Sequence, residues 1–159
     1  MAMATYLQMV TLEELAALEA DPSTINALNQ ETSVATHYCC TLNYFLTGNA
    51  YPDDHPLAAL MMGTRVVDAS TLENGNFGVV EPGEMEALVD ALGKVDPEAL
   101  RKAVEAADFD ELIEEEELYE LEVMEHSEVP GDLVELIASL HAMYEKASAE
   151  NAAVVMFTT

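Results

Sequence analysis

His37 and Cys40 are the two residues whose types and spacing come nearest to a metal site in this sequence. They stand three apart in a segment of helical periodicity, so both side chains would project from one face of a helix. A structural zinc site needs four such ligands, usually as two paired clusters. The other histidines, His55, His126 and His141, form no second pair. We therefore predict no metal and no cofactor.

Carboxylates are the most abundant metal-binding and acid–base groups in the chain. It has 31 Asp and Glu against 5 Lys and Arg, a net charge of −26. Fifteen of the acidic residues lie between Ala103 and Glu145, a stretch with no Lys or Arg. A calcium-binding loop needs alternating oxygen ligands around a central glycine, and Asp108, Asp110 and residues 114–117 do not provide that pattern. The sequence predicts a solvated acidic face instead.

Nucleophilic catalysis has no complete motif in the sequence. It requires a nucleophile within reach of an oriented base, and the chain has no Gly-x-Ser-x-Gly motif. No glycine-rich phosphate loop follows a predicted strand. Cys39 and Cys40 are adjacent within an apolar helical pattern and are predicted to be buried free thiols, as is common for cysteine. We predict no catalytic residue and favour a protein that is not an enzyme.

A small-ligand pocket is the alternative that the sequence leaves open. The loop from Asn49 to Pro56 contains two prolines and two aspartates, and long polar loops often carry binding residues. Four polar or aromatic side chains stand in or near this loop and could line a pocket: His37, Asn43, Tyr44 and His55.

Helices account for most of the elements that must position these groups. Thr11 and Glu14 have the spacing of a capping box and start the first helix. Apolar residues at helical spacing predict the others. These helices are expected after Asp21-Pro22, over Val34–Leu46 with an end at Gly48, over Leu57–Met62, from Pro82 through Leu92, from Asp96-Pro97 to Ala107, and over Leu133–Ala147. Asp110–Glu117 is expected to be an acidic turn or a short helix.

Strands are fewer, and one stands at each end of the chain. Thr5–Val10 is rich in strand-forming residues, and Ala152–Phe157 is a continuous apolar run of the kind found in central strands. Arg65–Val67 and the alternating segment Glu120–Val123 are two further expected strands, Asn74-Gly75 is a turn, and Pro130-Gly131 breaks the chain. The pattern predicts an α+β fold: a single domain over residues 1–159, with a small mixed sheet that includes the N- and C-terminal strands, packed by several amphipathic helices.

Three stretches, taken in order, resemble the YfbM-like family of small bacterial proteins of unknown function. They are the helix end Leu42-Asn43-Tyr44-Phe45-Leu46-Thr47-Gly48, the block from His55-Pro56-Leu57 to Gly63 with the later Phe77-Gly78 and the helix Glu84–Leu92, and the tail of Leu118-Tyr119, the helix Leu133–Ala147 and the closing strand. The resemblance implies a mixed α+β fold and no particular reaction.

Several polar positions of that family differ in this chain. Cys39 and Cys40 stand where the family typically has a tryptophan-aspartate pair, and Asn43 stands where a histidine follows. Glu81 occupies the position of a family arginine, and Glu120 replaces a proline. The side chains that would mark a site shared with the family are therefore replaced.

The charge excludes two classes of partner. A chain with a net charge of −26 repels nucleic acid phosphates and anionic membrane surfaces. There is no apolar run of membrane-spanning length and no visible secretory signal. We predict a cytoplasmic protein that binds neither nucleic acid nor membrane; the sequence does not set its oligomeric state.

A basic protein is the partner that this charge favours. Self-repulsion destabilises a compact acidic chain, so charge beyond what solubility needs invites a functional explanation. We predict a protein-binding module, in concrete form an immunity or antitoxin-type protein that neutralises a basic bacterial effector or toxin such as a nuclease. Mimicry of DNA is a weaker variant of this idea. The carboxylates expected to bind the partner are Glu111, Glu114, Glu115, Glu117, Glu122 and Glu125.

Overall fold

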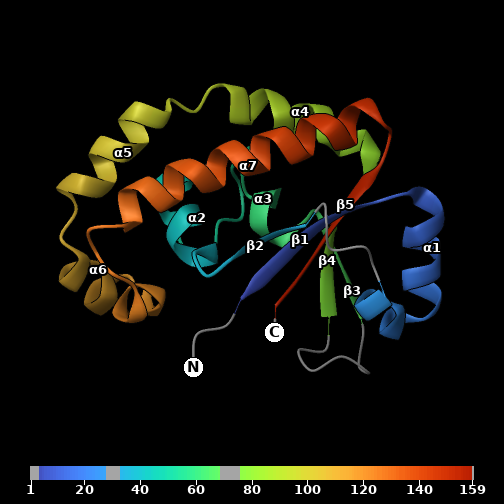
Figure 1. Ribbon diagram of the computed structural model, residues 1–159, viewed down its shortest axis with the longest axis horizontal. Coiled ribbons are helices and arrows are strands. Elements are labelled where there is room, and N and C mark those ends of the chain that lie inside the picture. The colour runs from blue at the N-terminus through green and yellow to red at the C-terminus, as the bar shows by residue number, and fades with distance from the viewer. Residues whose placement is uncertain (1–3, 28–32, 69–75, 159) are drawn as a thin grey trace.

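The computed structural model describes residues 4–27, 33–68 and 76–158. They form a five-stranded sheet in the order β2-β1-β5-β4-β3, with a long helix, α7, running across it (Figure 1). The strands are β1 (Thr5–Val10), β2 (Val34–Thr36), β3 (Arg65–Asp68), β4 (Asn76–Val80) and β5 (Ala153–Thr158). The α+β fold predicted from the sequence is confirmed, with strands near both ends of the chain in the sheet.

The helices connect the strands and cover the sheet. They are α1 (Leu12–Ala20), α2 (Cys39–Thr47), α3 (Ala59–Met62), α4 (Pro82–Gly93), α5 (Pro97–Ala106), α6 (Phe109–Glu115) and α7 (Val129–Ala149), with 3-10 helices η1 (Pro22–Ala27) and η3 (Tyr119–Val123). The capping box that starts α1 is present: Glu14 N–H donates to Thr11 Oγ1, and Thr11 N–H donates to Glu14 Oε1. None of the helices among the described residues is long and apolar enough to cross a membrane.

β5 lies between β1 and β4, so the apolar run near the C-terminus is central in the sheet, as its composition predicts. Successive side chains of a strand point to opposite faces. Val154 and Met156 accordingly join the large core beneath α4, α5 and α7, while Ala153 and Val155 join a smaller cluster with residues of α1. Each of the four strand pairings among the described residues is antiparallel, so the expectation of a mixed sheet is corrected.

Three local predictions are wrong. The helix expected over Val34–Leu46 begins only at Cys39, because residues 34–36 pair with β1 as strand β2. The strand expected over Glu120–Val123 is the 3-10 helix η3, in which Leu121 turns into the core. Pro130-Gly131 does not break the chain; it lies in the first turn of α7, where proline is tolerated.

Two further points concern the β3–β4 region. The strand β4 (Asn76–Val80) is not among the strands predicted from the sequence, although it pairs with both β3 and β5. β3 and β5 provide the backbone hydrogen-bond partners of β4. The sequence alone does not indicate these partners. The turn predicted at Asn74-Gly75 lies outside the described residues.

Tyr144 ties α7 to α3 through a buried hydrogen bond. Its side chain is 0 % exposed, and its hydroxyl donates to the carbonyl oxygen of Leu60 at 2.7 Å. Tyr144→Phe should lower the free energy of unfolding by about 1–3 kcal/mol, because a buried carbonyl loses its donor. Urea denaturation measures this, with Tyr119→Phe as the matched control since that side chain is 58 % exposed. Equal stability of the two variants would contradict the assigned bond.

Candidate functional site

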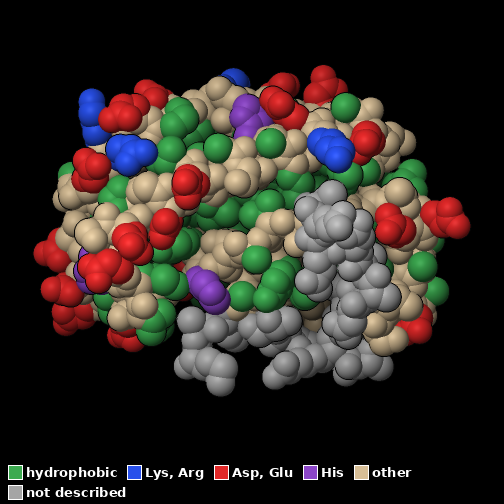
Figure 2. All heavy atoms as spheres, in the orientation of Figure 1, with side chains coloured by type: hydrophobic (Ala, Val, Ile, Leu, Met, Phe, Trp, Pro, Cys, Tyr) green, Lys and Arg blue, Asp and Glu red, His purple; other side chains and the backbone are tan. Residues whose placement is uncertain are grey.

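The acidic face is built at the end of the molecule where α5, α6, η3 and the start of α7 meet. Figure 2 shows acidic side chains crowded over this end. Two short helices make the turns: the Asp96 side chain accepts from Glu98 N–H at the start of α5, and Asp108 accepts from Glu111 N–H at the start of α6. These capping bonds satisfy backbone N–H donors that a helix start leaves free. They therefore stabilise the two helix starts that position the acidic side chains at this end.

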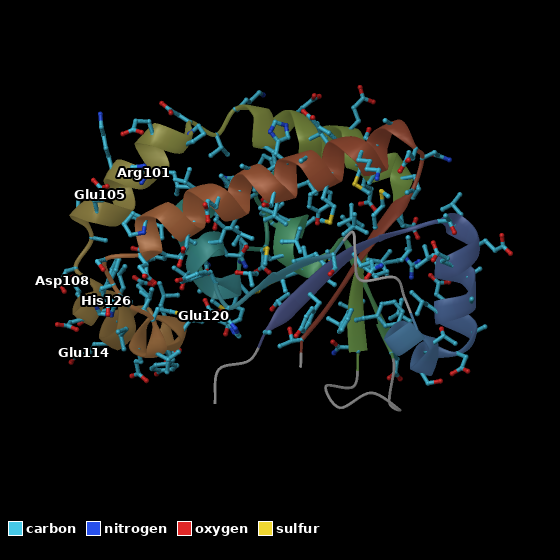
Figure 3. All side chains as sticks on the ribbon, in the orientation of Figure 1. Arg101, Glu105, Asp108, Glu114, Glu120 and His126 are labelled. Atoms are coloured by element: carbon cyan, nitrogen blue, oxygen red, sulfur yellow. The ribbon has the colours of Figure 1, made fainter. Side chains whose placement is uncertain are left out.

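An open groove of about 900 Å³ lies at this end, between α5, the start of α6 and the start of α7. Its only cationic side chain among the described lining residues is Arg101, while His126 lies opposite on the segment before α7 (Figure 3). Six carboxylate residues line it: Glu105, Asp108, Asp110, Glu128, Asp132 and Glu135. We call this the acidic groove.

The floor and walls of the acidic groove are held by specific contacts. The rings of Phe109 and His126 meet edge to face, with centroids 4.8 Å apart, and His126 Nε2 lies 2.9 Å from the Leu121 carbonyl oxygen. Asp132 is fixed because its Oδ2 accepts a hydrogen bond from the Tyr38 hydroxyl at 2.8 Å. Burial, followed by the bond to Asp132, raises the pKa of Tyr38, so this hydroxyl stays a donor.

Among the described residues, Arg101, the cationic side chain in the acidic groove, makes only one long ion pair. Arg101 Nε is 3.9 Å from a Glu98 carboxylate oxygen, at the outer limit of an ion pair. Along the described parts of the chain, the six lining carboxylates make no ion pair with Lys or Arg. The acidic groove therefore presents an excess of negative charge that no described side chain of this protein neutralises.

The six carboxylates predicted to bind a partner lie beside the acidic groove rather than in it. All six are exposed on α6, η3 and the turns around them. Glu111 lines a separate depression of about 430 Å³, which it shares with Tyr44 and Asp108. Glu128, Asp132 and Glu135, at and after the start of α7, have a spacing that the sequence does show, because these three positions fall on one helical face. The helix predicted from the sequence starts at Leu133, which hides that pattern.

The structure places the four residues predicted to form a pocket in different surroundings. His55 lies in a different depression, between α3 and α4, and its Nδ1 accepts from Leu57 N–H. Tyr44 lies between α2 and α6. Asn43 is 1 % exposed, and its amide donates to the Ala50 carbonyl. His37 precedes α2 instead of sharing a helical face with Cys40.

Another cavity, of about 370 Å³, lies at the start of α2. It extends to the first residues of β4 and the last residues of β5. Cys39 and Cys40 are half-buried and free, and both line it. Glu120 also lines it, from η3: its carboxylate accepts hydrogen bonds from Cys40 N–H and from both the N–H and the hydroxyl of Thr41. No local pattern indicates this contact, since it spans 80 positions of the chain. We call this space the sulfur cavity.

The two thiols differ in acidity. The Cys39 thiol donates a hydrogen bond to Cys40, which is the largest effect on Cys40 and lowers the pKa of that thiol to about 7, against the opposing effect of burial. The Tyr51 hydroxyl lowers it further, and the Glu120 carboxylate raises it. The same bond, with burial, raises the pKa of Cys39. Cys40 is therefore the more acidic of the two thiols that line the cavity.

Cys40 should react with iodoacetamide at a rate that rises through pH 7, because the thiolate is the reacting form. Cys39 should stay unmodified over the same range. Cys39→Ala removes the hydrogen-bond donor, so the midpoint for Cys40 should move up toward that of an ordinary thiol. Mass spectrometry of the alkylated peptide over a pH series measures both variants. A midpoint that is the same in both would show that Cys39 does not control Cys40.

Nearly the whole chain matches a family model. That model, described as a domain of unknown function, DUF1877, matches residues 1–157. This chain belongs to the DUF1877 family. A crystal structure of YfbM from Escherichia coli, a protein of unknown function, has a TM-score of 0.72 at 18 % identity, over 98 % of this chain and 99 % of that one. At this identity the likeness shows the fold alone. Among curated proteins, none matches.

Glu81, Glu120 and the two cysteines, which the sequence comparison singled out, have structural partners of their own in this DUF1877 chain. Glu81 accepts a hydrogen bond from Arg65 Nε at 2.7 Å, and Arg65 also pairs with Glu19. Glu120 caps α2, and the two cysteines line the sulfur cavity. Within the residues the structure describes, no group of three or more His, Cys, Asp and Glu is arranged to hold a metal ion.

Proposed function

We propose that this protein is a non-enzymatic binding module that engages a basic protein through the acidic groove and the exposed carboxylates beside it. The observation that carries the proposal is the excess of charge around the groove: six carboxylates face one arginine. Clefts lined by one sign of charge attract the opposite sign and speed association. The proposal adds the groove to the surface that the sequence indicated.

The shape of the acidic groove favours side chains of a protein partner. It is open to solution, so exposed Lys or Arg side chains can enter it, and its lining includes Val104, Phe109 and Pro130. The stem of a lysine or arginine can pack on such apolar groups while its head meets the carboxylates. Arg forms bidentate hydrogen bonds with carboxylates, so an arginine-rich surface fits best.

In its concrete form, the proposal is an immunity or antitoxin-type protein that acts in the cytoplasm and neutralises a basic effector such as a nuclease. Proteins that act on nucleic acid carry basic surfaces, which complement this acidic end. Charge complementarity also discriminates between partners, because juxtaposed like charges cost binding energy. DNA mimicry is the variant in which the partner normally binds DNA through the same basic surface.

The experiment that tests the proposal is a pull-down from native cell lysate with the protein tagged at either end in turn. A basic protein should be retained at low salt and released at high salt, because salt screens exposed charges. The same protein should then bind in purified form. A bait that retains no basic protein at low salt, with either tag, would contradict the proposal.

The alternative function is a small-molecule binder or enzyme with a pocket near residues 37–55. Its predicted residues lie apart, but the sulfur cavity stands in the same region and brings Cys40 close to Tyr51. A ligand that binds only the native state raises the melting temperature. A saturable shift with a metabolite, together with an empty pull-down, would favour this alternative.

A further inference from the structure

Sulfur is concentrated in one place in this protein. The chain has nine methionines and two cysteines, and five of these residues line the sulfur cavity. They are Cys39, Cys40, Met61, Met62 and Met156. Methionine is a common filler of cores, yet here three methionines line a space of about 370 Å³ together with two free cysteines.

The sulfur-bearing residues come from three elements that the fold holds together. The cysteines begin α2, Met61 and Met62 end α3, and Met156 belongs to the central strand β5. Met61 and Met156 are only 2 % and 4 % exposed, so their side chains are fixed by packing. The Met156 sulfur lies 2.8 Å from the position a Cβ on Gly78 would take, which places it at the cavity wall.

The charge around this cavity favours a cation. The Glu120 carboxylate lines it, and none of its described lining residues is Lys, Arg or His. The protein as a whole carries a net charge of −26. A positively charged ligand would therefore meet no competing cation, whereas an anionic thiol reagent would be repelled.

We propose that the sulfur cavity binds one soft monovalent metal ion, Cu(I), through the sulfurs of Cys39 and Cys40 and at least one methionine thioether. Soft thiolate and thioether ligands suit Cu(I), zinc and iron–sulfur clusters, and Cu(I) is the monovalent ion among these. Of the ligand types that zinc and calcium use, the described lining offers only Cys39, Cys40 and Glu120. No group of three or more His, Cys, Asp and Glu among the described residues is arranged to hold a metal ion. This inference is independent of the acidic groove, because the two sites share no lining residue.

The first test is a competition for Cu(I) between the reduced protein and the chromogenic chelator bathocuproine disulfonate, without oxygen. Wild-type protein should remove one equivalent from the chelator. Cys39→Ser/Cys40→Ser should weaken binding by more than about 100-fold, since even changes outside the ligand shell cost metal affinity tenfold or more. Failure of the wild-type protein to compete, or equal competition by the double variant, would overturn the site.

Matched methionine variants separate the cavity from the rest of the core. Met156→Leu removes a thioether from the cavity with little change in volume, and Met143→Leu makes the same change in α7, away from the cavity. Met156→Leu should lose affinity for Cu(I) and Met143→Leu should keep it. Equal affinity of these two variants, and of the corresponding variants Met61→Leu and Met62→Leu, would overturn the methionine part of the site.

A measurement on the unaltered protein avoids any question of folding. With 13C-methyl methionine labelling, one equivalent of Ag(I), a redox-inert analogue of Cu(I), should shift the methyl signal of at least one of Met61, Met62 and Met156. The signals of Met85 and Met143, which lie outside the cavity, should stay in place. Uniform small shifts, or shifts only outside the cavity, would refute the proposal, as would equally tight binding of Zn(II).

Discussion

Changing Glu105, Glu128 and Glu135 together to lysine should weaken binding of the basic partner by at least about 100-fold at low salt. These three side chains line the acidic groove, and no side-chain hydrogen bond of theirs is seen among the described residues. The variant should therefore fold. Asp108 and Asp132 are left unchanged because they hold Glu111 N–H and the Tyr38 hydroxyl. The affinity is measured by calorimetry at two salt concentrations, and the salt dependence should fall with it.

A control triple away from the groove makes this test specific, and a further triple tests the carboxylates beside the groove. Glu86, Asp90 and Glu150 are exposed on α4 and at the end of α7, and changing them to lysine alters the net charge by the same amount. That variant should bind within a few-fold of wild type. A third triple, Glu114, Glu117 and Glu122, tests the carboxylates that the sequence indicated. If the distant triple weakens binding as much as the groove triple does, net charge alone governs binding and the groove has no special role.

The ends of the sheet illustrate what the sequence can predict. Thr5–Val10 and Ala153–Thr158 pair along their whole length. Both faces of β5 are buried, so this strand is a continuous apolar run that its composition identifies, and Thr5–Val10 is identified by its strand-forming residues. The start of α1 is predictable for a different reason. Its capping box involves residues three apart, so the sequence contains both partners of each bond.

Contacts between distant segments explain most of what the sequence does not reveal. Residues 34–36 share helical spacing with the residues of α2, but pairing with β1 makes them a strand. Glu120 has the pattern of an exposed strand residue, yet its carboxylate caps α2 from the other half of the chain. In both cases tertiary contacts outweigh weak local preference.

The candidate sites divide in the same way. Acidic composition locates one end of the molecule, but the groove depends on where α7 begins, and the apolar periodicity places that start at Leu133 instead of Val129. The cysteine pair is visible in the sequence, whereas its three methionine neighbours come from segments up to 117 positions away, since Cys39 and Met156 share one cavity. The composition identifies the residues that could bind a ligand, but only the fold shows which of them line the same cavity.

Gly78→Ala should destabilise the protein by about 2–3 kcal/mol, because added atoms in a tightly packed region force the surroundings to shift. A Cβ at Gly78 would press against the backbone carbonyl of Met62 and lie 2.8 Å from the Met156 sulfur. Neither neighbour can easily move: Met62 ends α3, and Met156 is opposite Gly78 in the sheet. Urea denaturation monitored by circular dichroism gives the free energy of unfolding.

Gly93→Ala is the matched control, and the opposite sign is expected. Gly93 ends α4, and a Cβ there would have nothing within 4 Å. Alanine is favoured over glycine in helices by up to about 1 kcal/mol, so this variant should be as stable as wild type or more so. A loss of less than about 1 kcal/mol for Gly78→Ala would mean that α3 and β4 can separate at low cost. The wall of the sulfur cavity would then be adaptable, and Met156 would not be held at a fixed place. The expected large loss instead means that glycine at position 78 is what allows α3, β4 and the Met156 sulfur to meet.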